Sequence, residues 1–527
     1  MLETFTIIPV LGSKTGVPAN DASLFVPAGE NAALTHDTGG VNVDYTRTRN
    51  TCRKSLGKSC FSSVATTTTQ YCLGLFNMDG TNWVFMGNGG SLGRVFKYGG
   101  SKVPTRIHDG SSSEYGGGTA DLYSIIRYGD YLVFADNANH TPYKVQNSDA
   151  NLSKLILSGT EYKFKYLETF QRRIIGASST QTNGDIEIRW TDPLPAMGSL
   201  DFPSGNQLYK EDDDPITGIK RMSRNVCMLY GENTIDQIAY YSQAATPFGI
   251  VNLIPDQGCT GHHSIVNMAG RHFFFNKNYG FCEYRGGQEF PYGGRPISEA
   301  IEDQVADITS AYHFGIVGST VPGTHEIVWS VPLGGVSVPS HLLFYDTVKG
   351  DWRKKEIEAS YVAPISTGDI PWEDLTEEVW SELTNQGLRW IDLYNINEKL
   401  AYSYNNGHVY IDKSEAMDGS DYSGYRVEPA IRLGGGRSLL SEIWFGLTEV
   451  GDYSLFCYHR SGNTIGELEA SDWTLLEGLS CDSPAEPVIR LNKNSIFHQI
   501  KWGTDGKNEP FGVNKIEFKY TPQRTSY

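Results

Sequence analysis

Histidines are the first residues of this chain whose types could support metal chemistry. His262 and His263 are adjacent and His272 follows in the next strand-like run. No Cys or carboxylate stands beside them at a spacing typical of zinc ligands. Adjacent residues of a strand point to opposite faces, so the pair would not converge on one ion. We therefore interpret all three as polar histidines of loops or strand ends and expect no metal.

A second candidate is the acidic run "KEDDDP" at 210–215, which groups four carboxylates. Oxygen ligands of this kind suit Ca²⁺, but the regular spacing of an EF-hand loop is missing. Charge runs are usually solvated turns. We expect a turn here, and the sequence leaves open whether Ca²⁺ binds near Asp212 and Asp214.

Motifs for catalysis are incomplete. "NMDGTNW" at 77–83 approaches the Asp-box of sialidase-type propellers, but its Asp79 and Gly80 are adjacent, so the spacing is wrong. The glycine-rich runs "YGGGTAD" and "RLGGGR" lack the Gly-Lys-Ser/Thr ending of a phosphate-binding loop. No Gly-x-Ser-x-Gly nucleophile elbow occurs. The sequence predicts no enzyme and no cofactor.

The elements that would position such residues are repeated hairpins. "HFFFNKNYGFCEYRGG" at 272–287 is an aromatic run, a polar turn with Asn-Tyr-Gly, and a second aromatic run. Similar pairs recur, and the middles of their first strands provide markers. Five of the six steps between markers are 41 to 54 residues, and the last step of 75 residues contains an insert. The markers are Phe85, Phe134, Ile175, Met228, Phe274, Val328 and Ser403.

This period predicts a mainly β fold built on a β-propeller of six to eight blades, because a propeller blade takes about 40–55 residues. An ordinary set of sandwich hairpins is the alternative. We expect three segments: an N-terminal β-rich platform at 1–75, the propeller at 76–414, and a C-terminal β-sandwich at 415–527. An acidic insert near 366–388 has apolar residues at helical spacing after Pro371.

Composition restricts the function. With 57 glycines and 12% aromatic residues the chain favours short strands and tight turns. The net charge of −17 repels nucleic acid and anionic lipid, which argues against a sequence-reading DNA-binding protein. No run approaches the ~18 apolar residues of a membrane span, and we expect none.

One region is more specific. In order it contains "IRWTDP", "DFP", "DPITGI", "YGENTI", "PFG", "GC…HHSIV", the hairpin at 272–287 and "PIS". This ordered set, within 172–303, resembles the tail nozzle or hub proteins of short-tailed double-stranded-DNA bacteriophages, also called packaged-DNA stabilisation proteins. The flanking hairpins match loosely and the two ends weakly.

The resemblance implies a structural virion protein of the tail, assembled in the host cytoplasm as a homohexamer. Such a ring would continue the channel of the portal-adaptor ring above it, with tail fibre or needle proteins beside or below. It would retain packaged DNA and let the genome pass without sequence-specific contacts during ejection.

A basic cluster, "RTRNTCRKSLGKS" at 47–59, is a candidate for facing DNA or an acidic tail partner. A solvated loop or an intersubunit salt-bridge patch is the alternative for the same residues. The candidate residues are Arg47, Arg49, Arg53, Lys54 and Lys58.

Two other functions remain open from sequence alone. A propeller-type tail protein could bind or degrade polysaccharide, although the Asp-boxes and convergent carboxylates of such enzymes are not found in the sequence. A soluble interaction scaffold unrelated to viruses would differ from a nozzle by remaining a monomer.

Overall fold

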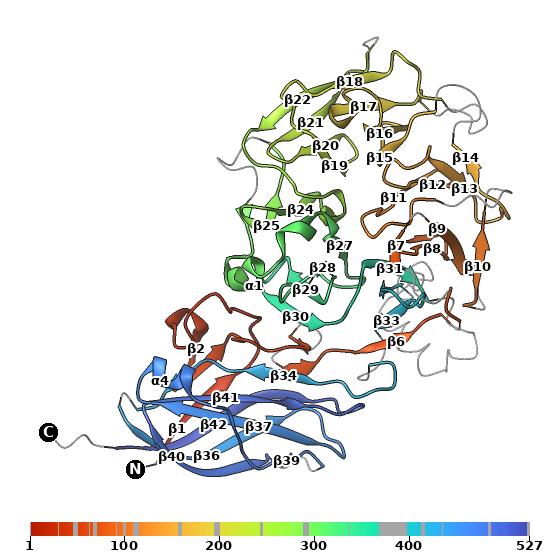
Figure 1. The fold of residues 1–527 in the computed structure, drawn as a ribbon. Coiled ribbons are helices and arrows are strands. Elements are labelled where there is room, and N and C mark those ends of the chain that lie inside the picture. The colour runs from red at the N-terminus through yellow and green to blue at the C-terminus, as the bar shows by residue number, and fades with distance from the viewer. Residues whose placement is uncertain are drawn as a thin grey trace, which may run out of the picture.

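The computed structural model describes residues 2–523 apart from 30, 46–50, 63, 67–70, 91, 99–101, 109–114, 156–160, 194–200, 243–245, 288–294, 337, 368–397, 413–416, 435 and 483–485. The chain is mainly β, as the sequence predicts, and consists of two bodies (Figure 1). The sheet ring contains seven four-stranded antiparallel sheets. The two-sheet body contains an eight-stranded and a six-stranded sheet. Most of the expected acidic insert lies outside the described residues.

The sheets of the ring follow one another along the chain. The first four, each from its first strand outward, are β7 (Tyr71–Met78), β8 (Thr81–Gly87), β9 (Gly93–Tyr98), β10 (Pro104–Ile107); β11 (Ser124–Tyr128), β12 (Tyr131–Ala135), β13 (Tyr143–Val145), β14 (Ser153–Lys154); β15 (Phe164–Phe170), β16 (Arg173–Ser179), β17 (Glu187–Trp190), β18 (Gln207–Tyr209); and β19 (Ile216–Ser223), β20 (Val226–Gly231), β21 (Ile235–Tyr240), β22 (Phe248–Ile254). The other three are β23 (Val266–Met268), β24 (Arg271–Asn276), β25 (Gly280–Tyr284), β26 (Arg295–Pro296); β27 (Val317–Thr320), β28 (Glu326–Val331), β29 (His341–Asp346), β30 (Trp352–Glu356); and β31 (Tyr361–Ser366), β32 (Glu398–Ser403), β33 (Tyr410–Asp412), β6 (Lys58–Cys60).

Each predicted hairpin forms the second and third strands of one sheet, and each of the seven markers lies in a second strand. The hairpin of β24 and β25 pairs Phe274 with Cys282 and ends on Asn276 opposite Gly280. The Asn276 side chain accepts the backbone N–H of Asn278 at 2.7 Å, which forms the tight turn. Gly280 has a φ of 69°, a backbone conformation that glycine adopts without strain.

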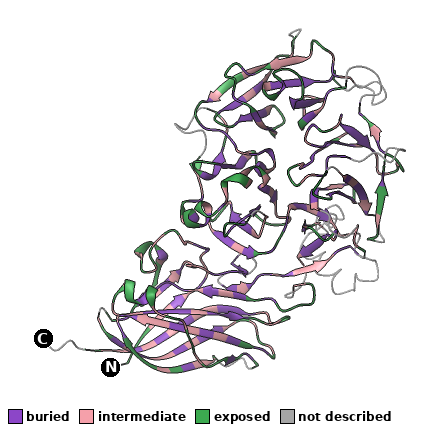
Figure 2. Ribbon diagram, viewed as in Figure 1, coloured by how far each residue is buried: buried purple, intermediate pink, exposed green. Residues whose placement is uncertain are grey.

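Burial explains why these sheets form a ring. The second strands are almost wholly buried, because neighbouring sheets cover both of their faces (Figure 2). Hydrophobic clusters join successive sheets; one of them packs Trp190 of the third sheet with Ile219 and Phe248 of the fourth. A small sheet that buries neither face alone is stabilised when each face packs on a neighbour.

The ring is closed by contacts between first strands. β7 contacts β11, the contacts continue through β15, β19, β23 and β27 to β31, and β31 contacts β7 again. The last sheet takes its outermost strand from the N-terminal part of the chain, since β6 pairs with β33 through Ser59 opposite Ile411. One sheet therefore joins segments about 350 residues apart in the sequence.

The two-sheet body also joins distant parts of the chain. Its eight-stranded sheet runs β2 (Phe25–Gly29), β3 (Ala32–Thr35), β1 (Glu3–Ile8), β42 (Gly512–Pro522), β36 (Ser438–Leu447), β40 (Val488–Ser495), with β5 (Cys52–Lys54) on β42 and β4 (Val43–Asp44) on β5. The six-stranded sheet runs β34 (Gly424–Val427), β41 (Phe497–Thr504), β37 (Ser454–Gly462), β38 (Thr474–Leu475), with β35 (Ile431–Arg432) on β41 and β39 (Leu479–Ser480) on β37. The two sheets share one hydrophobic core that includes Ile7, Phe445 and Trp502.

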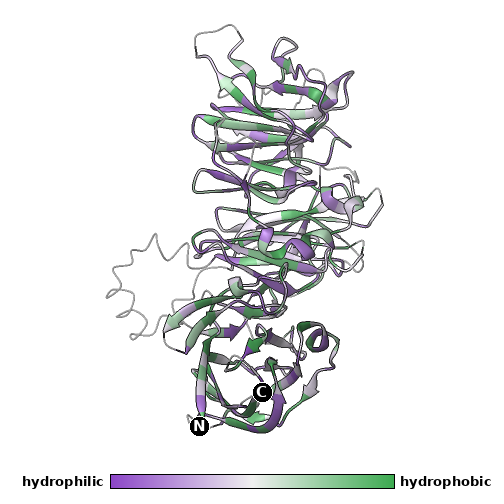
Figure 3. Cartoon of the chain, turned by 90° about the vertical axis from the view of Figure 1, so that its left-hand side faces the viewer, coloured by the Kyte–Doolittle hydropathy of each residue, from purple (hydrophilic) through white to green (hydrophobic). Residues whose placement is uncertain are grey.

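The strand pairing adds to the expected division into segments. The expected C-terminal sandwich at 415–527 contains the strands β36, β37, β40, β41 and β42. β1 pairs with β42 along Glu3–Ile8, so residues from the expected N-terminal segment complete the C-terminal sheet. Figure 3 shows the ring above this body from a second direction. The expected boundaries at 75 and 414 stay a prediction.

Helices are few and short among the described residues. They are η1 (Ala22–Leu24), η2 (Gly184–Ile186), η3 (His262–Ser264), η4 (Glu299–Ile301), α1 (Glu302–Ala306), η5 (Ser310–Gly315) and α4 (Ile465–Ala470). In the part of the chain that is described, no helix has the length and apolar character needed to cross a bilayer.

Candidate binding site at one mouth of the ring

The segments that lead into several first strands converge at one mouth of the sheet ring and line two adjoining cavities. The tyrosine pocket, with a volume of about 210 Å³, is lined by Tyr71, Tyr312, Phe314 and Tyr404 together with smaller residues. The histidine pocket, of about 310 Å³, lies beside it. Leu122 and Phe314 line both cavities. Because the first strands of the sheets begin at the same end of the ring, residues more than 300 positions apart in the sequence, such as Tyr71 and Tyr404, line one concave surface.

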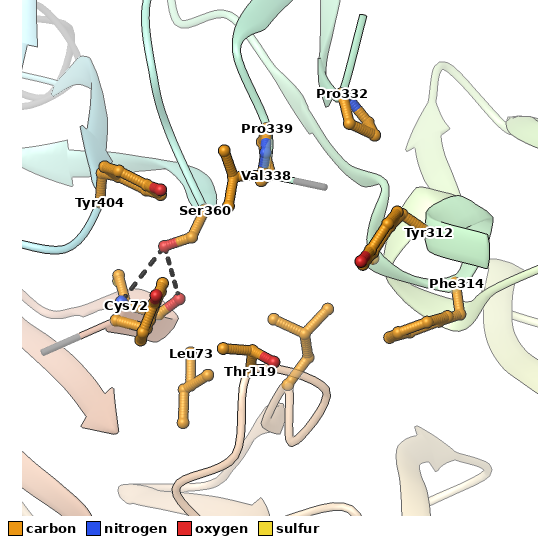
Figure 4. A pocket seen from close by; sticks show the side chains of 13 residues that line it. Cys72, Leu73, Thr119, Tyr312, Phe314, Pro332, Val338, Pro339, Ser360 and Tyr404 are labelled. Carbon is orange, nitrogen blue, oxygen red and sulfur yellow. Dashed lines mark hydrogen bonds between the residues drawn. The ribbon is translucent and has the colours of Figure 1, made fainter. Parts of the chain in front are cut away.

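Local structure fixes the walls of the tyrosine pocket. Tyr71 begins β7, and its ring meets that of Tyr404 edge to face, with centroids 6.0 Å apart. Tyr312 and Phe314 belong to η5 and stand across the cavity from Tyr404 (Figure 4). The Ser360 hydroxyl donates to the Cys72 carbonyl oxygen at 2.9 Å, which joins the start of β31 to that of β7.

Protonation states keep the tyrosine pocket neutral. Burial raises the pKa of Tyr404, so its hydroxyl stays protonated near pH 7 and can donate a hydrogen bond. Burial also raises the pKa of Cys72 to about 12, so its thiol is not a nucleophile at neutral pH. Among the thirteen described lining residues none carries a formal charge.

The histidine pocket has a different character. Burial lowers the pKa of His262 well below its usual value and that of His263 to about 3. His262 stacks on Tyr166 with centroids 4.8 Å apart, and its Nδ1 lies 3.4 Å from the Ile219 backbone nitrogen. Lys165 is the one formally charged residue among the described residues that line this cavity near pH 7. The histidines are therefore neutral, packed side chains.

His272 lies apart from both cavities. It is fully buried in β24, and its Nδ1 is 2.7 Å from the Tyr230 hydroxyl. Among the described residues no group of three His, Cys, Asp or Glu side chains is arranged to hold a metal ion.

The carboxylates of the acidic run surround the side chain of Lys210. The Lys210 ammonium is buried and bonds to the Thr234 hydroxyl at 2.6 Å. It also lies 3.2 Å from a carboxylate oxygen of Asp236, 3.4 Å from one of Asp214 and 3.5 Å from one of Asp212. The position that Ca²⁺ would take between these carboxylates thus holds a lysine.

Two of the five basic candidates, Arg47 and Arg49, lie outside the described residues. The other three contact neighbouring parts of this chain. Arg53 forms a salt bridge of 2.7 Å with Glu449, and the Lys54 ammonium donates to the Gly506 carbonyl oxygen at 2.8 Å. The Lys58 ammonium lies 4.6 Å from the ring centroid of Tyr410. None of these three lines either cavity at the mouth, and a role in facing DNA or a partner stays a prediction.

Sequence reasoning did not find the tyrosine pocket. Its residues come from the start of β7, from the segments before β11, β27 and β31 and from two hairpin connections, so no motif contains them. One local feature stands out, since Phe314 in η5 is an aromatic residue outside a strand and is 44% exposed.

Comparisons with known proteins show little resemblance. No family model matches the chain, and no curated protein matches it. Among solved structures, U3-55K is similar with 9% identity and a TM-score of 0.41, covering 67% of this chain and 98% of that chain. An exo-β-1,3-galactanase from Phanerochaete chrysosporium has 9% identity and a TM-score of 0.27, covering 88% of this chain and all of that one. A 6-phosphogluconolactonase-like protein from Bacteroides fragilis has 12% identity and a TM-score of 0.35, covering 55% and 81%.

Proposed function

We propose that the seven four-stranded sheets are the blades of a seven-bladed β-propeller, that the two-sheet body is a β-sandwich, and that the chain is a structural component of a phage tail. In this proposal six copies form a nozzle that continues the portal-adaptor channel. The ring retains packaged DNA and lets the genome pass during ejection. Fibre or needle proteins attach beside or below it.

The observation that carries this proposal is that strands from the N-terminal part of the chain complete a sheet in each of the two bodies. β6 completes the last sheet of the ring by pairing with β33, and β1 pairs with β42 in the other body. Each body therefore holds strands from both the beginning and the end of the sequence. A tail component stands under the pressure of confined DNA, and strands paired in this way leave no terminal sheet that can peel away alone.

Two further features support the same function. Most of the ordered sequence motifs that resemble nozzle proteins fall in β17 and in the sheets of β19–β22 and β23–β26, which pack on one another through two hydrophobic clusters. Six copies at −17 each would carry a charge of −102. Such a surface disfavours nonspecific phosphate contacts, as a conduit for moving DNA requires.

The proposal is tested in a phage whose genome encodes this chain. A nonsense mutation in its gene should give heads that package DNA but lose it, measured as genome sensitivity to nuclease. Supplying the wild-type chain from a plasmid should restore retention and infectivity. If particles without the chain keep their DNA and infect normally, the nozzle function is wrong.

A charge variant examines the basic cluster separately. Reversing Arg47, Arg49, Arg53, Lys54 and Lys58 to Glu should impair genome retention or assembly if these residues face DNA or a tail partner. Because Lys54 is buried, a variant changing only Arg47 and Arg49 controls for simple misfolding. Normal assembly and retention in both variants would remove the cluster from the functional account.

A further inference from the structure

The tyrosine pocket is uncharged in a chain where one residue in five is charged. Thirteen described residues line it. If they had the charged fraction of the whole sequence, which is 20%, two or three of them would be Asp, Glu, Lys or Arg. A charged ligand would lose its hydration here without meeting a countercharge, which disfavours its binding. The lining therefore favours a neutral ligand.

The pocket also offers hydroxyl groups without partners. The side-chain hydroxyls of Tyr71, Tyr312, Tyr404 and Thr119 line it and make no hydrogen bond to any other residue that the structure describes. Phe314 adds an apolar ring that is 44% exposed. Figure 4 shows Tyr404 and Thr119 on the walls around the opening, with Tyr312 and Phe314 on the opposite side from Tyr404.

We propose that this pocket binds an uncharged saccharide. A pyranose ring has an apolar face of C–H groups that stacks on an aromatic ring, and an edge of hydroxyls that both donate and accept hydrogen bonds. Phe314 and the tyrosine rings match the face, and the free hydroxyls match the edge. An apolar peptide side chain would fill the same space but leave those hydroxyls buried without partners, which disfavours such a ligand.

The two cavities define the length of the ligand. The tyrosine pocket, at about 210 Å³, is smaller than the ~300–1,000 Å³ of sites for drug-sized molecules and suits a single sugar ring. Phe314 and Leu122 line both cavities, so the histidine pocket is the neighbouring space for a second, linked sugar. There Lys165, Asn137 and Thr260 provide polar groups for its hydroxyls. The site thus takes a neutral sugar in the tyrosine pocket and a second, linked sugar beside Lys165 in the histidine pocket, and it does so whether or not the chain belongs to a tail.

Binding is tested with the purified full-length chain by calorimetric titration and saturation-transfer NMR. The neutral probes are lactose, maltose, cellobiose and di-N-acetylchitobiose, and the charged probes are sialyllactose and a glucuronic acid disaccharide. We expect at least one neutral probe to bind saturably and more tightly than the charged ones. If every neutral probe fails to saturate, or if the charged probes bind equally well even after Lys165→Met removes the positive charge of the histidine pocket, the proposal is overturned.

Variants locate the binding. Phe314→Ala should weaken the best probe by about tenfold, the worth of one aromatic contact. Tyr312→Phe, which removes only a hydroxyl, should weaken it about fivefold. The matched control is Tyr241→Ala, because this exposed tyrosine lies outside both pockets, and it should bind as wild type. Equal affinity in all three variants, each with a wild-type melting temperature, would place the sugar elsewhere and overturn the site. A tyrosine- and proline-rich peptide that displaces the sugar from a shared pocket with higher affinity would also overturn it.

Discussion

The buried ion pair in the two-sheet body leads to the sharpest prediction about stability. Arg426 of β34 and Glu428 are both fully buried, and the Arg426 Nε donates to a Glu428 carboxylate oxygen at 2.7 Å. The guanidinium also donates to the carbonyl oxygens of Leu11, at 3.0 Å, and Thr35, at 2.6 Å. Trp502 of β41 donates to the same carboxylate at 3.0 Å. This group therefore ties the N-terminal segment to the six-stranded sheet.

Replacing Arg426 with Met keeps much of the side-chain volume but removes the charge. Glu428 would then retain only the donors from Trp502 and the Thr35 hydroxyl. Removing one partner of a buried pair costs about 3–5 kcal/mol, so the free energy of unfolding should fall by that amount. The double variant Arg426→Met with Glu428→Leu should recover most of the loss, because no buried charge remains.

The assay is urea denaturation combined with amide hydrogen exchange on β1, β34 and β41. Local exchange is needed because the two bodies of the chain need not unfold in one step. The control is Arg490→Met, since that side chain is 81% exposed and its change should cost less than about 1 kcal/mol. A loss of under 1 kcal/mol in Arg426→Met, or faster exchange only in the sheet ring, would refute this account of how the chain ends are joined.

Three further predictions concern other parts of the chain. Burial lowers the pKa of His272 and His459 to about 3 and that of His498 to about 4, so below the unfolded value of about 6.5 the unfolded chain binds more protons. Stability should therefore fall as the pH drops from 6.5, by about 2 kcal/mol per histidine at pH 5, and an unchanged urea midpoint between pH 7 and 5 would contradict this. Ser59→Pro should increase amide exchange in β33 because a proline removes a ladder donor from β6, whereas Ser59→Ala should not; equal exchange would mean that β6 is dispensable. Lys210→Met should lower the melting temperature because it leaves carboxylates buried without a cation. Millimolar CaCl₂ should restore part of the lost stability in this variant and should not raise the melting temperature of the wild type. A variant as stable as wild type would show that the lysine does not hold the carboxylates together.

The hairpins were predictable because their signals are local. Phe274 and its equivalents stand in apolar runs of strand length beside turns with Gly or Asn, and each run became a second strand buried on both faces. The glycine and aromatic content likewise anticipated a mainly β chain. These features depend on neighbours within about twenty residues.

What the sequence did not reveal depends on distant pairing. β6 is three residues long and has no alternating pattern, yet it completes a sheet whose other strands begin at Tyr361. The tyrosine pocket combines Tyr71 with Tyr404, and only closure of the ring brings them together. In the sequence Lys210 belongs to a run of charged residues, which predicts an exposed turn. Its burial depends on pairing with Asp236 of β21, which is distant in the sequence. Such contacts are set by topology rather than by local propensity.

The most direct test of the proposed function is an electron cryo-microscopy reconstruction of the virion whose genome encodes this chain. The account predicts six copies around the channel below the portal-adaptor ring, each with seven four-stranded sheets closed by β6. A particle that lacks the chain, or that carries it away from the channel in another number of copies, would contradict it.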